Sequence, residues 1–142
     1  SNTEGQLPYR GVVQKALRVR PFSALRSVLL VSPNEVDIVL EGGEVLKPLG
    51  GLKVIHTPGH TPGSISLLSP KANLIMVGDA LHSHGRSPYP PHEMPSTNIR
   101  QALDSLKEIA RLDFDTICFG HGRPLIGNAH PKIQKLIERT RD

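Results

Sequence analysis

Short apolar runs alternate with turns rich in glycine, proline and asparagine from residue 36 onward. Runs of aliphatic and β-branched side chains bounded by such turns are typical of β-strands. They predict strands at residues 36–40, 44–46, 52–55, 64–69, 74–77 and 116–119. The Glu-Gly-Gly sequence at residues 41–43 predicts that the first two strands form a hairpin.

Two later segments show helical spacing instead. Apolar side chains recur at this spacing at Ile99, Ala102, Leu103, Leu106, Ile109 and Ala110, and again at Ile133, Leu136 and Ile137. We expect the first helix to follow a capping residue among residues 96–98 and the second to begin near Pro131. A short helix is also predicted from Phe22 towards Val28. The order of strands, helix, strand and helix predicts a mixed α/β fold.

The segment between the strands and the first helix has a different composition. Residues 80–95 contain three histidines and four prolines, which predicts an irregular loop. Long loops in compact domains are often functional.

Composition and charge exclude several classes of protein. The chain has 142 residues, of which 37% are hydrophobic and 21% charged, and it lacks the apolar run of about 18 residues that a membrane span needs. Its net charge is +4, but the basic residues are scattered and lack interleaved aromatic side chains, so nucleic-acid binding is not expected. The single cysteine, Cys118, excludes an intrachain disulfide and favours the cytoplasm.

Three polar residues stand at the ends of predicted strands. His60 follows residues 52–55, Asp79 follows residues 74–77, and His121 follows residues 116–119, each flanked by glycine. Two imidazoles and a carboxylate suit Zn²⁺, and strand ends hold ligands rigidly. Polar residues at strand ends also act as caps and turn formers, so this pattern alone leaves both interpretations open.

The sequence motifs around these three residues are more specific than their position at strand ends. Thr-Pro-Gly-His-Thr-Pro-Gly-Ser at 57–64, Gly-Asp-Ala-Leu at 78–81 and Gly-His-Gly at 120–122 occur in an order and at separations that resemble the metallo-β-lactamase superfamily of metal-dependent hydrolases. The resemblance extends over about residues 36–128. It implies an αββα sandwich with two divalent metal ions at one edge, zinc by expectation, with manganese or iron as alternatives. It also implies that His60 binds one metal, His121 the other, and that Asp79 bridges both and is catalytic.

One family motif is missing. Family members carry an earlier His-x-His-x-Asp-His motif, and no histidine precedes His56 here. His82-Ser83-His84 has the spacing of the first part of that motif but follows Asp79. We therefore expect residues 1–142 to be a single partial domain: the C-terminal half of the sandwich, a mixed sheet with flanking helices, at 36–142, after a poorly defined lead-in at 3–35. Ser1 and Asn2 are interpreted as the remnant of a tag.

The resemblance implies hydrolysis of a small-molecule ester, lactone, thioester, amide or phosphoester by metal-bound hydroxide. Because ligands are missing, the isolated chain is expected to be inactive, and a metal-free binding module with a degenerate half-fold is the alternative. His82, His84 and Arg86 are candidate substrate contacts or solvated loop residues, and His56 is expected to form hydrogen bonds within its loop.

The missing half also has a structural consequence. We expect an uncovered inner sheet face, to be buried in a homodimer or larger assembly or by the missing N-terminal half. The residues assigned to that face are Val54, Ile65, Leu67, Ile75 and Val77.

Overall fold

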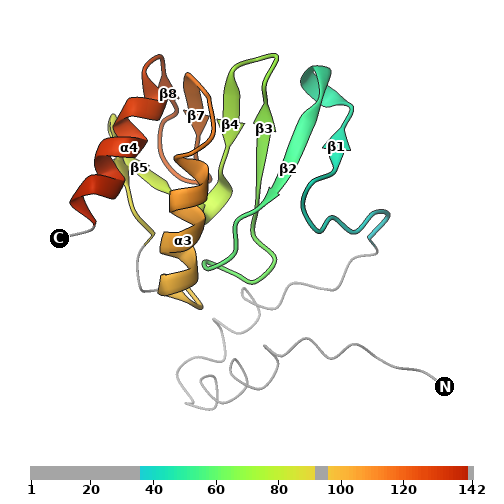
Figure 1. The fold of residues 1–142 in the computed structure, drawn as a ribbon, viewed down its shortest axis with the longest axis horizontal. Helices are drawn as coiled ribbons and strands as arrows, with labels where there is room; N and C mark the ends of the chain where they lie inside the picture. The colour runs from blue at the N-terminus through green and yellow to red at the C-terminus, as the bar shows by residue number, and fades with distance from the viewer. Residues whose placement is uncertain (1–35, 92–95, 141–142) are drawn as a thin grey trace, which may run out of the picture. The chain divides into compact units, whose positions relative to one another are not determined.

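The computed structural model describes residues 36–91 and 96–140. From Val39 onward the chain makes one compact unit. A six-stranded sheet runs through it in the order β1-β2-β3-β4-β7-β8, and β5 and β6 form a separate two-stranded sheet (Figure 1). The strands are β1 (Val45–Leu46), β2 (Leu52–His56), β3 (Ile65–Ser69), β4 (Leu74–Met76), β5 (His82–His84), β6 (Ser87–Tyr89), β7 (Thr116–Cys118) and β8 (Leu125–Ile126).

Two α-helices and two single-turn 3₁₀ segments complete the described fold. The 3₁₀ segments are η2 (Pro48–Gly50) and η3 (Gly78–Ala80), and the α-helices are α3 (Ile99–Ile109) and α4 (Ala129–Arg139). Strands β1 to β4 form an antiparallel meander, whereas β4 and β7 are parallel and are connected through α3. The edge strand β8 pairs antiparallel with β7. The sheet is therefore mixed, as predicted.

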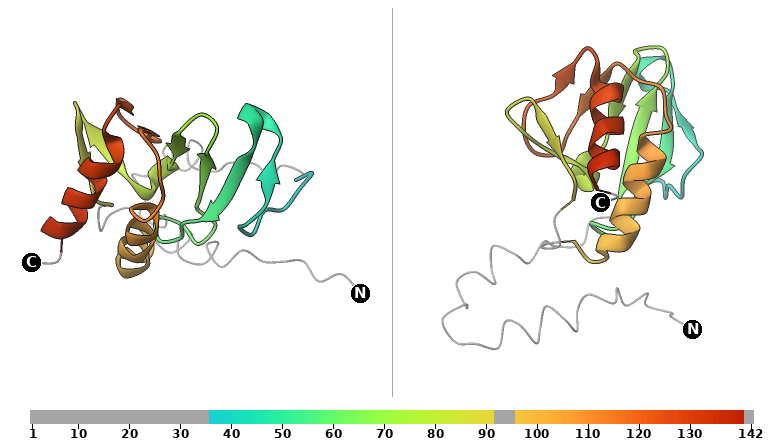
Figure 2. Two further views of the ribbon diagram at one scale, coloured as in Figure 1. Left: turned by 45° about the horizontal axis from the view of Figure 1, so that its top comes forward. Right: turned by 60° about the vertical axis from the view of Figure 1, so that its left-hand side comes forward.

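Both helices lie beside the sheet (Figure 2), and the hydrophobic core lies between them and the sheet. The register places Leu68, Ile75, Ile117 and Leu125 side by side on one face of the sheet. These side chains are buried in one cluster with apolar residues of the helices, namely Leu106 and Ile109 of α3 and Ile133 and Ile137 of α4. Both helices thus bury their apolar stripes against the same sheet face.

The second face of the sheet is defined here by Val54, Leu67, Met76 and Cys118, which are consecutive cross-strand partners. Val54 is buried, and the other three are half-buried. The prediction of a single inner face was wrong in part. Ile75 and Val77 belong to the face that the helices cover, because side chains alternate along a strand and the cross-strand register then fixes the face.

The predicted hairpin between 36–40 and 44–46 is wrong. Residues 36–40 form no strand, and β1 pairs with β2 instead. The carboxylate of Glu44 accepts the N–H groups of Glu41 and Gly42, so the turn closes on a side chain. The backbone of Gly43 and Glu44 then bonds to Val54, which continues the ladder towards β2.

The loop predicted at 80–95 is also wrong in part, because it contains the β5–β6 hairpin. Pro88 is tolerated in β6 because both strands of a two-stranded sheet are edges. The remaining strands agree with the prediction to within about two residues, and α3 begins after Asn98, whose side chain accepts the N–H of Gln101. Helix α4 begins at Ala129, slightly before Pro131.

Two predicted segments fall outside the described residues. They are the helix from Phe22 towards Val28 and the end of the 80–95 loop, at residues 92–95. Within the ranges 36–91 and 96–140, every helix is too short or too polar to cross a bilayer.

Candidate metal centre

His60 lies in the loop that connects β2 to β3, and backbone turns fix the course of that loop. The Thr57 N–H donates to the Ser64 carbonyl oxygen at 2.9 Å, and the Gly59 N–H donates to the Thr61 carbonyl oxygen at 3.1 Å. The Thr61 N–H in turn donates to the Ser64 hydroxyl oxygen at 3.1 Å. His60 therefore projects from a tightly folded segment.

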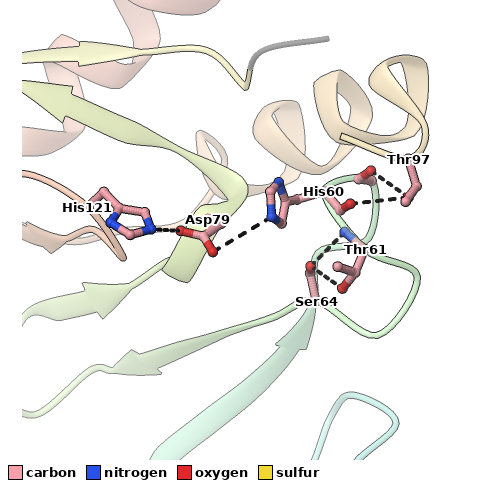
Figure 3. Close-up of polar contacts among 7 residues, drawn as sticks. His60, Thr61, Ser64, Asp79, Thr97 and His121 are labelled. Carbon is pink, nitrogen blue, oxygen red and sulfur yellow. Dashed lines mark hydrogen bonds and ion pairs between the residues drawn. The ribbon is translucent and has the colours of Figure 1, made fainter. Parts of the chain in front are cut away.

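The start of α3 holds the same loop from the other side. The Thr97 hydroxyl donates to the carbonyl oxygens of Gly59 and His60 at 3.0 and 3.2 Å (Figure 3). The Asn98 N–H also donates to the Gly59 carbonyl oxygen, at 2.9 Å. A Cβ placed on Gly59 would overlap the backbone of Ala102, so only glycine lets the loop lie this close to the helix.

A second link joins the loop to the middle of α3. The Ser105 hydroxyl donates to the Pro58 carbonyl oxygen at 2.7 Å. Sequence reasoning missed Thr97 and Ser105 as positioning residues. No local pattern signals these contacts, because the partners are 38 and 47 residues apart in the chain.

Asp79 occupies the 3₁₀ turn that directly follows β4. Backbone bonds to the end of β7 and to the segment after it fix this turn: the Val77 N–H donates to the Cys118 carbonyl oxygen at 2.9 Å, and the Gly120 N–H donates to the Gly78 carbonyl oxygen at 2.7 Å. A Cβ on Gly120 would overlap Oδ1 of Asp79. The lack of a side chain at Gly120 therefore makes room for the Asp79 carboxylate.

The three candidate ligands converge on one carboxylate. His60 Nε2 lies 3.8 Å from Oδ2 of Asp79, and His121 Nε2 lies 3.6 Å from Oδ1. Figure 3 shows the carboxylate between the two imidazoles. The side chains of His60, Asp79 and His121 are 19%, 35% and 79% exposed, so the cluster opens to solvent on the His121 side. Oδ1 of Asp79 is buried and has no hydrogen-bond partner among the described residues.

Each imidazole–carboxylate pair has a spacing that fits a divalent cation. Two ligand atoms that each lie about 2.0–2.2 Å from one Zn²⁺ ion are ~3.4 Å apart at the tetrahedral angle and up to ~4.2 Å apart at wider angles. Both imidazole-to-carboxylate distances fall in that range. A buried carboxylate oxygen without a partner is costly unless a cation or proton satisfies it. The set is incomplete, however: in the described ranges, no group of three or more His, Cys, Asp or Glu side chains is placed to hold a metal ion.

The β5–β6 hairpin packs beside His121. The Ser83 N–H donates to the His121 carbonyl oxygen at 3.3 Å, and the Ser83 hydroxyl donates to the Arg123 carbonyl oxygen at 2.7 Å. The rings of His82 and His121 are 6.0 Å apart between centroids. His82 is therefore next to the cluster, whereas His84 and Arg86 are exposed further along the hairpin.

The comparisons with known proteins bear directly on this cluster. A model of the metallo-beta-lactamase superfamily matches residues 9–121, which begin earlier than the motifs quoted above and include all three candidate ligands. The chain belongs to the metallo-β-lactamase superfamily. A probable metallo-hydrolase from Methanocaldococcus jannaschii is 32% identical over 104 residues, covering 70% of the chain and 48% of the relative. A hydroxyacylglutathione hydrolase from Bartonella henselae is 32% identical over 94 residues, covering 62% and 35%.

Solved structures of metallo-β-lactamase superfamily proteins share the fold. One from Sulfolobus tokodaii is 20% identical with a TM-score of 0.64, and the match covers 93% of the chain and 50% of that protein. One from Thermus thermophilus is 24% identical with a TM-score of 0.65, covering 94% and 47%. The chain thus spans about a third to a half of the length of these relatives. This agrees with the predicted half of a metallo-β-lactamase sandwich.

Two other histidines of this superfamily member have structural partners. His56 Nε2 forms a hydrogen bond of 2.8 Å with the Pro62 carbonyl oxygen, which confirms the expected bond within the loop. His130, at the start of α4, forms a hydrogen bond of 2.9 Å with the Ala110 carbonyl oxygen. Both imidazoles therefore brace backbone segments.

Proposed function

We propose that this chain is the C-terminal part of a metal-dependent hydrolase and supplies three ligands, His60, Asp79 and His121, to its metal centre. The observation that carries the proposal is the Asp79 carboxylate, whose buried Oδ1 lacks a described partner while an imidazole faces each of its oxygens. In this proposal Asp79 would hold two cations, and each histidine would bind one of them. Zinc is the preferred metal, with manganese or iron as alternatives.

Each residue has a distinct task in the proposed centre. Divalent cations, when bound, lower the pKa of a water to roughly 7 and polarise the oxygen of the bond to be cleaved. Asp79 supplies negative charge to two positions at once, and Gly120 keeps side-chain volume away from its Oδ1. The exposed side of His121 admits a small-molecule substrate, and His82 beside it is placed to orient that substrate. His84 and Arg86 are more distant candidate contacts.

The names of relatives bear on the number of metal ions and on the type of bond. A solved structure of a protein 26% identical to the chain, with a TM-score of 0.56, is described as a di-iron-bound form, which supports a dinuclear centre. Two relatives are named hydroxyacylglutathione hydrolase and atrochrysone carboxyl ACP thioesterase. These names favour a thioester or ester bond over an amide or phosphoester bond. A cytoplasmic location fits the single Cys118.

The incomplete ligand set favours a second candidate function. Three ligands do not fill two coordination shells, so the isolated chain is proposed to lack hydrolase activity. In the alternative, the chain is a metal-free binding module that retains the half-fold. The observation that favours this alternative is that no group of three or more His, Cys, Asp or Glu side chains in the described ranges is placed to hold a metal ion.

Metal titration separates the two candidates. The metal-stripped chain is titrated with Zn²⁺ and Mn²⁺ by calorimetry, beside Asp79→Asn and His60→Ala. A metal role predicts binding that weakens at least about tenfold in both variants. His84→Ala is the matched control, because His84 is an exposed histidine outside the cluster and its loss leaves metal affinity unchanged. If the wild-type chain takes up no metal and His60→Ala changes nothing, the metal-free module is the better description.

A further inference from the structure

A groove lined by basic residues lies between the β5–β6 hairpin and α4, outside the candidate metal centre. Its volume is about 240 Å³. Seven residues line it, four of which are cationic and none acidic: Arg86, Ser87, Pro88, Lys132, Lys135, Leu136 and Arg139. Leu136 and Pro88 are partly buried, and the cationic side chains are exposed. The groove therefore combines an apolar base with charged walls.

The sequence spacing on α4 explains how the cations gather. Lys132, Lys135 and Arg139 are separated by three and four residues, so they follow one face of the helix together with Leu136. Arg86 joins them from the turn of the hairpin, more than forty residues earlier in the chain. The basic C-terminal stretch, which composition alone assigns to a solvated surface, thus becomes one wall of a concave site.

A neighbouring groove provides a comparison, because its basic side chains form ion pairs within the protein. It lies between α3 and α4, has a volume of about 340 Å³, and also contains basic side chains. There, Lys107 forms an ion pair with Asp104 and Arg111 forms one with Glu108. By contrast, none of the four cations of the basic groove is within ion-pair distance of a carboxylate from residues 36–91 or 96–140.

We propose that the basic groove binds a compact phosphate-bearing polyanion, of which inorganic diphosphate is the simplest representative. Cations grouped without counter-charges repel one another, and a polyanion removes that repulsion. The planar guanidinium groups of Arg86 and Arg139 suit two-pronged contacts to phosphate oxygens, and the lysines add point charges. A single carboxylate would offset only one of the four charges.

The groove favours a small molecule over a nucleic-acid strand. Sequence-tolerant binding of single strands depends on aromatic side chains that stack on bases, and the lining contains none. The volume is also below the ~300–1,000 Å³ of most drug-sized ligand pockets, which is appropriate for a ligand as compact as diphosphate. Nucleic acid is therefore an outcome for the experiment to exclude.

Calorimetric titration with inorganic diphosphate tests the proposal. The protein is stripped of metal on a chelating resin and carries Asp79→Asn, so that the candidate metal centre cannot contribute to binding. Diphosphate is expected to bind, and the double variant Lys132→Gln/Lys135→Gln is expected to bind about tenfold more weakly, because two of four charges facing the anion are removed. Affinity also falls as the salt concentration rises.

Lys107→Gln is the matched control, since it removes an exposed lysine of the neighbouring groove. It leaves diphosphate affinity unchanged, and Lys132→Arg/Lys135→Arg, which keeps the charge, retains binding. Equal affinity in the glutamine double variant and the parent protein overturns the proposal, as does an equal loss in Lys107→Gln. Tighter binding of a short single-stranded oligonucleotide than of diphosphate overturns the small-molecule assignment.

Discussion

Two glycines in the His60 loop offer a sharp test of how this loop is held. Gly59 and Gly63 both follow a proline and lie on either side of His60. Gly59 has φ +135°, and a Cβ there would overlap the backbone N and Cα of Ala102 and lie 2.5 Å from its Cβ. Gly63 has nothing within 4 Å of the corresponding position. The same substitution, glycine to alanine, therefore meets opposite environments four residues apart.

We expect Gly59→Ala to lower the free energy of unfolding by about 2–5 kcal/mol. Overpacking against a helix costs ~1–3 kcal/mol, and an unfavourable backbone conformation costs a similar amount. Gly63→Ala is expected to change stability by less than ~0.5 kcal/mol. Urea unfolding followed by circular dichroism measures both, and Gly59→Ala should lower the midpoint by ~1 M or more.

The helix partner supplies a further check. Adding Ala102→Gly removes one of the overlapping atoms but leaves the backbone N and Cα of residue 102 in place. The double variant should therefore remain destabilised. Equal unfolding free energies for Gly59→Ala and Gly63→Ala would refute the close approach of loop and helix. Because His60 is the next residue, Gly59→Ala should also weaken Zn²⁺ binding if the metal proposal holds.

Three other predictions concern separate parts of the molecule. Thr97→Val removes the hydroxyl that bonds to two carbonyls of the His60 loop and should cost about 1 kcal/mol in urea unfolding, whereas Thr97→Ser should not. The pKa of Glu44 lies below its ordinary value of 4.5, mainly because the Glu41 N–H donates to its carboxylate. The resulting stabilisation of the turn is complete above about pH 4.5 and is lost as the pH falls through the lowered pKa, so a carboxyl-carbon NMR titration should give a midpoint below 4.5. Leu67, Met76 and Cys118 of the second face are half-buried. Their burial between two copies predicts twice the mass of one chain in light scattering, and a monomer at high concentration would contradict it.

Several features of the fold could be predicted from the chain itself. Local patterns are sufficient to predict an element when neighbouring residues determine its conformation. Examples are α3, with its apolar spacing and its cap Asn98, and the short strands that end in Pro-Gly or Gly-Asp. The order of the motifs around His60, Asp79 and His121 also identified the superfamily. These signals are local because periodicity and turn chemistry are properties of neighbouring residues.

Only the tertiary structure decided how these elements combine. The Glu-Gly-Gly turn closes on Glu44 and sends the next residues to β2, and the hairpin at 82–89 forms where Ser83 bonds to the segment after β7. Which strand side chains meet the helices follows from cross-strand register, so Ile75 and Leu67 face opposite sides. The basic groove and the anchoring of the His60 loop by α3 both depend on contacts between residues that are dozens of positions apart in the sequence. Such contacts are set by packing geometry and hydrogen-bond satisfaction in the folded chain, for which a linear sequence has no local marker.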